Sequence, residues 1–438
     1  MNVRQAMNLR NPMTMTIGCL CALGLVVAGC GSSSGGGSSP GVSAKSVTFG
    51  THQPLTGPAA PGYSEIAPAS AAFFKYLNSQ GGINGRKLNL VYKDDEYNPS
   101  KTVSVVHQLV LQEKVFGIFE GLGTPTHTKV VGFLNTSKVP DIFVASGCPC
   151  WDNGTSQPYT FGWQPNYTIE GKILGQYVKQ HFAGKKVGVF YQDDDFGKGG
   201  LAGLRAELSS GQIVSTQAYQ PGGTNVAPQI SALKGAGAQV LIDFTVPIYT
   251  ALGQLTSFTL GYKPQLVVSN VGIDPTTVGA LLKSFSKGKA GSELIEGAVT
   301  DGYLPSTADL SNPWVALFKK VHDQYDSGAP FDGNVEYGMA AAYTLAQTLQ
   351  LAGKDLTRAK LVEAINNSGS KLRGPGLVPF RYSKTVHGGY AGTEMGQVRG
   401  GKIVLFGGPL TTEPDPSSPI TPYSASQPAP PASGVSVP

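Results

Sequence analysis

From Lys45 onward, two patterns of apolar residues alternate along the chain. Short alternating or continuous apolar runs predict β-strands, and apolar residues that recur every three to four positions predict helices. Strands are predicted at 46–51, 87–94, 115–119 and 141–145, with helices between them at 66–80, 99–110 and 126–137. Strands that are separated by helices of about 10–15 residues indicate βαβ units around a parallel sheet.

A second series of the same kind follows. Its strands are predicted at 186–191, 213–219, 240–244 and 265–269, again with helical segments between them. Two such series predict two doubly wound α/β lobes. Three further helical patterns, at 314–325, 335–351 and 356–366, have few strands between them and are expected to complete the two lobes. The stretch 413–438 is rich in Pro and Ser and is expected to be a disordered tail.

The N-terminal pattern differs from that of the rest of the chain. Arg4 and Arg10 precede an uncharged apolar stretch at 13–29, which is typical of a secretory signal. The word Val27-Ala28-Gly29-Cys30 resembles a bacterial lipobox, which implies cleavage before Cys30 and lipidation of its sulfur. An ordinary signal or a buried helix is the alternative. Residues 1–29 are thus expected to be a signal peptide. Residues 30–44 are expected to be the lipidated Cys and a flexible Gly/Ser linker that anchors the protein outside the cytoplasm.

Composition and charge narrow the class of protein. Hydrophobic residues at 40% support a large core and exclude wholesale disorder. The single long apolar run excludes a polytopic membrane protein. A formal net charge of +5, with charged residues at 14%, argues against a nucleic-acid partner.

The five cysteines fall into three groups. Cys19 and Cys21 leave with the signal, Cys30 is the expected lipid anchor, and Cys148 and Cys150 remain in the mature chain. In an oxidising compartment the last two are either joined in a disulfide or remain free thiols. Two sulfurs without a nearby His do not predict a metal site.

Several words of the sequence resemble the periplasmic Leu/Ile/Val-binding protein family. They are Val47-Thr48-Phe49-Gly50, Pro54-Leu55-Thr56-Gly57-Pro58, Gly81-Gly82-Ile83-Asn84-Gly85-Arg86, Tyr92-Lys93-Asp94-Asp95-Glu96 and Val187–Gly197. The resemblance implies the type I periplasmic binding protein fold, in which two Rossmann-like lobes joined by three hinge strands close over a ligand. It places the crossings near 161–165, 296–299 and 373–376. Lobe 1 would comprise 45–162 plus 300–372, and lobe 2 would comprise 163–299 plus 373–412.

The ligand site is expected where the strands of both lobes end, because open α/β sheets bind ligands outside the carboxyl ends of their strands. The family holds a ligand carboxylate with hydroxyls and backbone N–H groups in the loops that match 121–126 and 146–147. The candidate ligand-binding residues are Leu122, Gly123, Thr124, Thr126, Ser146, Gly147, Tyr191, Tyr249 and Asn270. Trp151 and Trp163, like the two tyrosines, are either aromatic walls of the site or ordinary core and hinge residues.

Two positions depart from the family pattern. The serine-rich word after the third strand is replaced by Gly121-Leu122-Gly123-Thr124-Pro125. The loop that often supplies an acidic partner for a ligand ammonium reads Asn270-Val271-Gly272. A branched-chain or related amino acid and an aromatic or aliphatic carboxylate therefore both remain open as ligands.

The remaining motifs give little information about function. Gly197–Ala202 superficially matches a dinucleotide fingerprint, but three aspartates precede it, and acidic runs at strand-to-helix junctions more often cap the following helix. The six His residues have no metal-site spacing, and no nucleophile elbow occurs. We expect a monomeric, non-enzymatic receptor of an ABC importer that needs neither cofactor nor metal, with permease subunits as partners. A ligand-sensing receptor and a lipid-anchored hydrolase are the alternatives.

Overall fold

The first sheet is built entirely from parallel strands. The computed structural model describes residues 39–438, and in it five strands pair in the order β2-β1-β3-β4-β5. They are β1 (Ser46–Gln53), β2 (Lys87–Asp94), β3 (Ile118–Phe119), β4 (Asp141–Val144) and β5 (Thr160–Gly162). The segments between them contain α1 (Ala60–Tyr63), α2 (Ile66–Ser79), α3 (Pro99–His107), η1 (Gln108–Gln112), α4 (Thr124–His127), α5 (Val131–Thr136) and η2 (Pro149–Trp151).

The second sheet combines a parallel half with an antiparallel half. Its order is β13-β12-β11-β10-β9-β8-β6-β7, with β6 to β10 parallel and β11 to β13 antiparallel. The strands are β6 (Val187–Gln192), β7 (Ile213–Tyr219), β8 (Val240–Phe244), β9 (Gln265–Val268), β10 (Val299–Gly302), β11 (Gly392–Arg399), β12 (Lys402–Thr411) and β13 (Thr421–Pro422). The intervening helices are α6 (Tyr167–His181), α7 (Asp195–Glu207), α8 (Ala227–Gly235), α9 (Pro247–Thr259), η3 (Asn270–Gly272), α10 (Pro275–Phe285) and η4 (Ser292–Ile295).

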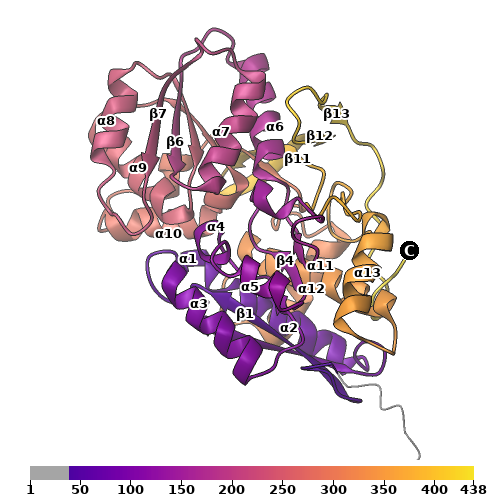
Figure 1. The fold of residues 1–438 in the computed structure, drawn as a ribbon. Helices are drawn as coiled ribbons and strands as arrows, with labels where there is room; N and C mark the ends of the chain where they lie inside the picture. Colours follow the sequence, from indigo (N-terminus) through magenta and orange to yellow (C-terminus); the bar gives the residue numbers. More distant parts are fainter. Residues whose placement is uncertain (1–38) are drawn as a thin grey trace, which may run out of the picture. The chain divides into compact units, whose positions relative to one another are not determined.

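Three later helices complete the lobe of the first sheet. They are α11 (Pro313–Tyr325), α12 (Gly333–Ala352) and α13 (Arg358–Ser368), followed by η5 (Gly369–Lys371). In Figure 1 these orange helices lie beside the indigo and purple strands, and α11 and α12 pack against α2. Each begins with a side-chain cap, from Asn312, Asp332 and Thr357 respectively. The two-lobed α/β fold expected from the sequence is thus confirmed.

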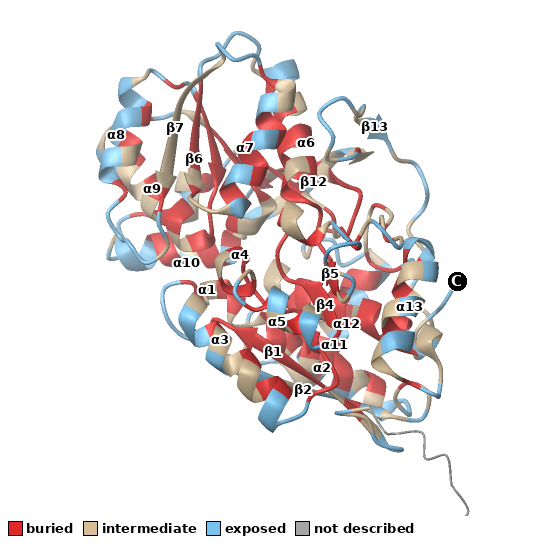
Figure 2. Cartoon of the chain, viewed as in Figure 1, coloured by how far each residue is buried: buried red, intermediate tan, exposed pale blue. Residues whose placement is uncertain are grey.

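Buried residues line the central strands of both sheets, such as β6, and the inner faces of the helices, whereas strands such as β7 are mostly half-buried and the outer faces of helices such as α8 are exposed (Figure 2). α12 is the exception, because it is buried almost all round. A helix that is apolar on every side belongs in a core. Among residues 39–438, no helix is both long and apolar enough to span a membrane.

The chain crosses between the lobes three times, after β5, after β10 and before β11. The second crossing was expected at 296–299, but Val299 already pairs within the second sheet and the crossing follows β10. Each crossing contributes one aromatic ring to a single cluster. Trp163, Tyr303 and Tyr390 have ring centroids 5.3–5.9 Å apart. Trp163 is completely buried there and donates to Thr344 Oγ1, so its ring packs among the crossings.

The expectation of a disordered tail is wrong for the described structure. Lys172 Nζ on α6 donates to Thr412 Oγ1 and to the carbonyl oxygens of Glu413, Asp415 and Ser418. Further along, the tail reaches the other lobe, where Trp314 Nε1 on α11 donates to the Pro428 carbonyl oxygen. Proline-rich chain is extended and has few N–H groups to satisfy, so donors of the folded lobes can hold it through its carbonyl oxygens.

The expected signal peptide and Cys30 lie outside the described residues. The last part of the expected linker is described, and it packs: Val42 forms an antiparallel bridge with Val47. The Gly41 carbonyl accepts a hydrogen bond from Thr48 N.

Candidate functional site

A cavity of about 370 Å³ lies between the two lobes, where the strands of both sheets end. From the lobe of the first sheet it is lined by residues of the segments after β1, β2, β3 and β4 and of the start of α12. From the other lobe it is lined by residues that follow β6, β8, β9 and β10, with the start of α10 and residues 401–405. This is the position at which α/β sheets bind ligands.

Four of the nine predicted residues line this cavity, namely Leu122, Gly123, Thr124 and Asn270. The first three form the turn between β3 and α4. Gly123 has a φ of 100°, and a Cβ there would lie 2.4 Å from the Tyr97 ring. Only glycine therefore allows the turn to approach the cavity in this conformation.

Three predicted residues lie behind the lining and hold it in place. Thr126 Oγ1 donates to the carbonyl oxygens of Leu122 and Gly123. The Ser146 hydroxyl is 2.7 Å from Thr124 Oγ1, and the Gly147 carbonyl accepts from Tyr167 N at 2.7 Å. They support the cavity-lining residues without lining the cavity themselves.

The two predicted tyrosines are not at the cavity. Tyr249 stacks on Tyr219 with ring centroids 3.8 Å apart, and its hydroxyl accepts a hydrogen bond from Gly222 N. Tyr191 lies against α7, where a Cβ on Gly197 would meet its ring. Both side chains pack within their own lobe. Trp151 is also buried away from the cavity, in a small cluster with Val144 and Cys148.

Other aromatic residues take the place expected for those tyrosines. Tyr63, Tyr97, Tyr167, Tyr303 and Tyr337 all line the cavity. Most of them lie in loops or at the first turn of a helix, where no apolar periodicity marks them. One local signal did exist: Tyr167 directly follows Asn166, which caps α6, and Tyr97 directly precedes Asn98, which caps α3.

The sequence also missed an acidic group beside Asn270. Asn270 Nδ2 donates to Glu170 Oε1 at 2.8 Å and to Asp301 Oδ2 at 3.1 Å, and Asp301 lines the cavity. Burial raises the pKa of Glu170 well above its usual range and raises that of Asp301 to about 6. The two carboxyl groups therefore meet at Asn270, and Asp301 is the one of the two that lines the cavity.

Polar contacts join the two lobes across the cavity. Tyr63 Oη donates to the Val271 carbonyl oxygen at 3.1 Å, and Gly333 N donates to Asp274 Oδ2 at 3.1 Å. Burial, and after it the Asp332 carboxyl, raise the pKa of Asp274 to about 6 and that of the nearby Glu65 to about 8. The lobes are therefore in contact beside the cavity, and carboxyl groups lie at that contact.

A buried chain of side chains anchors the turn that carries Thr124. His52 Nδ1 is 2.8 Å from Asp95 Oδ2, His52 Nε2 is 2.9 Å from His127 Nδ1, and His127 Nε2 is 2.8 Å from Asp141 Oδ2. All four side chains are completely buried. Because His127 ends α4 and Asp95 lies two residues before Tyr97, this series of hydrogen-bonded side chains connects two cavity-lining segments.

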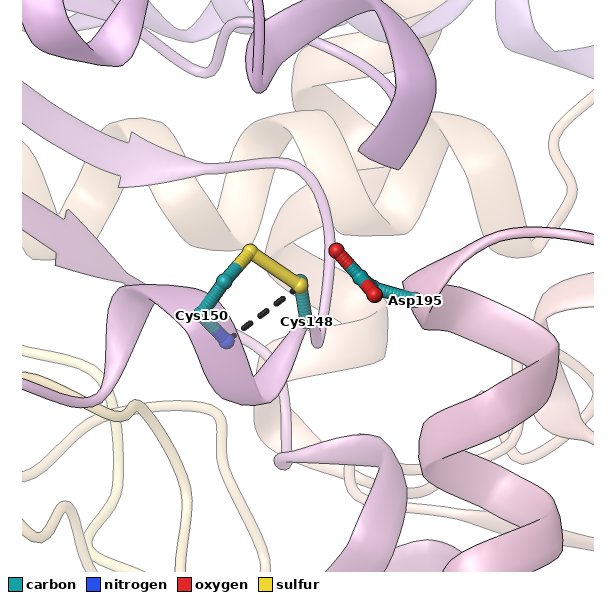
Figure 3. A group of neighbouring side chains, drawn as sticks. All are labelled: Cys148, Cys150 and Asp195. Atoms are coloured by element: carbon teal, nitrogen blue, oxygen red, sulfur yellow. Dashed lines mark hydrogen bonds between the residues drawn. A yellow bond between two sulfur atoms is a disulfide. The ribbon is translucent and has the colours of Figure 1, made fainter.

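Cys148 and Cys150 are joined in a disulfide directly after β4 (Figure 3). With Asp195 they are the only group of three possible metal-ligating residues close enough to share an ion among residues 39–438. Both sulfurs are occupied by the disulfide, so this group is not a metal centre in the oxidised protein. Asp194, next to it, caps α7 through Phe196 N and Gly197 N, as the acidic run predicted.

The model of a family described as periplasmic binding protein matches residues 46–402. The Leu/Ile/Val-binding protein homolog 3 of Brucella melitensis biotype 1 is 27% identical over 213 residues, which are 44% of this chain and 53% of that protein. An amino acid binding protein of Pseudomonas aeruginosa is 24% identical over 207 residues, 44% of this chain and 52% of that protein. The chain therefore spans about half the length of these curated relatives.

Solved structures show the same fold. A branched chain amino acid ABC transporter structure from Thermus thermophilus with bound valine has a TM-score of 0.73 at 20% identity, covering 84% of this chain and 97% of that chain. A fatty acid ABC transporter substrate-binding protein from Thermomonospora curvata has a TM-score of 0.72 at 21% identity, and the match covers 86% of this chain and 95% of that chain.

Proposed function

Because this chain belongs to the periplasmic binding protein family, we propose that it is an extracytoplasmic solute-binding protein that delivers a small solute to an ABC importer. The observation that carries the proposal is the cavity between the lobes, which meets the carboxyl ends of both sheets. A ligand that contacts both lobes there stabilises the closed arrangement only through contacts that the open one lacks. The permease then recognises the closed form.

The ligand is a small carboxylate that also carries an ammonium group. Thr124, supported by Ser146, offers a hydroxyl for the carboxylate. The acidic partner that the Asn270 loop lacks is available from Asp301, one strand away and hydrogen-bonded to Asn270. An ionised carboxylate at the cavity wall favours an amino acid over a carboxylate without an amine. The relatives named for amino acids agree with this choice.

The chain is held at the membrane by lipid on Cys30. The support is the sequence Val27–Cys30 alone, which resembles a lipobox. Replacing Cys30 by Ser should move the protein from the membrane fraction to the soluble fraction, and unchanged fractionation would contradict the anchor.

A ligand panel tests the binding function. At 100 times its dissociation constant, a true ligand raises the free energy of unfolding by about 2.7 kcal/mol, which a thermal-shift screen of amino acids and carboxylates detects. Asp301→Asn should weaken binding of the best amino acid by about 10- to 100-fold, because one hydrogen bond to a charged group is lost. Asp193→Asn, at an exposed acid paired with Lys198, is the matched control. Mass spectrometry should recover the ligand intact, and turnover would instead indicate a hydrolase.

A further inference from the structure

Two neighbouring residues of α12 bring unpartnered polar atoms to the cavity. Glu336 and Tyr337 both line the cavity, and they are only 3% and 9% exposed, respectively. Neither Glu336 Oε1 nor the Tyr337 hydroxyl has a hydrogen-bond partner among residues 39–438. Buried polar atoms of native proteins nearly always have a partner, so a pair without one inside a binding cavity needs an explanation.

The ligand's own side chain can supply that partner. An aliphatic side chain in the cavity would keep both oxygens out of water and give them nothing in return. A site with buried polar groups of this kind discriminates strongly against a ligand that cannot hydrogen-bond to them. The cavity is therefore a poor match for leucine, isoleucine or valine.

The charges around the cavity specify the kind of hydrogen-bond donor. Asp274, Asp301 and Glu336 line the cavity. Asp301 and Glu336 are buried, and Asp274 is half-buried. Among the described lining residues, Lys402 is the only one with a basic side chain, and it is exposed. The lining thus has an excess of acidic groups, and a cationic donor matches it better than a neutral one.

We propose that the solute carries a second, positively charged nitrogen group in its side chain, an amine or guanidinium, which binds Glu336 Oε1. This inference rests on the proposed function, since it assumes that the cavity holds the solute. It assigns a ligand of the basic amino acid class, with its α-ammonium near Asp301 and its side-chain nitrogen at α12.

Binding of such a ligand releases a proton. Burial keeps the pKa of the Glu336 carboxyl well above its usual range, and burial together with the Glu336 carboxyl raises the pKa of Tyr390. Because Glu336 is buried and the one basic residue among the described lining residues, Lys402, is exposed, burial favours the neutral form of the Glu336 carboxyl in the free protein. When the ligand cation arrives, the carboxyl O–H bond breaks, the proton goes to water, and the carboxylate that remains pairs with the cation.

Calorimetric titration of the folded chain with matched ligand pairs tests the proposal. Ornithine, lysine and arginine are compared with norvaline and norleucine, in two buffers that differ in ionisation enthalpy. We expect at least one basic ligand to bind tenfold or more tightly than the aliphatic ligands and to release close to one more proton. Glu336→Gln should reduce that ratio to less than threefold. Asp243→Asn, at a buried aspartate of β8 outside the cavity, should leave it unchanged.

The outcomes separate this inference from the proposed function. If leucine or norleucine binds as tightly as every basic ligand, or if Glu336→Gln keeps the full preference, the side-chain cation is wrong while solute binding stands. If no solute of the wider panel binds the wild-type chain, both are wrong. Circular dichroism and the melting temperature of each variant confirm that it is folded.

Discussion

Lys172 holds the C-terminal tail through its ammonium group, and its removal should release the tail. Residue 172 is completely buried on α6, and Nζ lies 2.7–3.0 Å from one hydroxyl and three carbonyl oxygens of residues 412–418. An ammonium has three protons, so it makes three full hydrogen bonds at once. Hydrogen bonds to a charged group contribute about 1.5–3 kcal/mol each when buried. Because most of these tail residues are exposed and can bind water instead, about 1 kcal/mol each is the appropriate figure.

Lys172→Met keeps the apolar stem and removes the ammonium, so it should weaken attachment of the tail by about 3 kcal/mol, a factor of roughly 100 in the population of released tail. Hydrogen exchange of the amides in 413–423 measures this population directly. Lys179→Met, at an exposed position on the same helix, is the control and should leave exchange unchanged. Equal exchange in wild type and Lys172→Met would refute the assignment of this lysine as the clamp.

Three more predictions follow from buried contacts. His127→Phe leaves the buried Asp141 carboxylate with only the Thr160 hydroxyl as a side-chain partner and should lower the free energy of unfolding, measured in urea, by about 3 kcal/mol; a loss below about 1 kcal/mol would contradict the anchoring role of the two histidines. The pKa of Asp274 is raised from 3.8 to about 6 and that of Glu65 from 4.5 to about 8, so these groups favour the native state fully only below their ordinary pKa values and lose that contribution as the pH rises through the raised values. The free energy of unfolding of the wild type minus that of Asp274→Asn should therefore fall between about pH 4 and about pH 6, and a rise over this range would contradict the assignment. Tyr249→Phe should change the ligand dissociation constant by less than threefold, as calorimetry would show, because its hydroxyl bonds to Gly222 N away from the cavity.

Much of the lobe architecture could be predicted because it follows from local pattern. The alternation of strand and helix sets the two sheets, and the Gly-Thr-Pro word after β3 marks a turn whose backbone must come close to the cavity. Asp194 could be assigned as a helix cap because such residues favour that position whatever the rest of the fold. These features depend on residues that are neighbours in sequence.

The site was harder to predict because it depends on contacts between distant segments. Tyr191 and Tyr249 follow the right strands, but a strand end does not say toward which neighbour a ring packs. Asp301 was missed because no strand is predicted at 299–302, where the structure has β10, and the residue follows the segment 296–299 that is expected to be the second crossing. One signal of the structure was present in the sequence: Glu336 is a charged residue within a largely apolar helical segment. We assign this residue to the ligand.

A crystal structure of the chain grown with the best ligand of the panel would show where the solute binds. We expect electron density for one solute between the lobes, with its carboxylate beside Thr124, its α-ammonium beside Asp301, and a side-chain nitrogen within hydrogen-bond distance of Glu336. Density for the solute outside this cavity would contradict the assignment of the binding site.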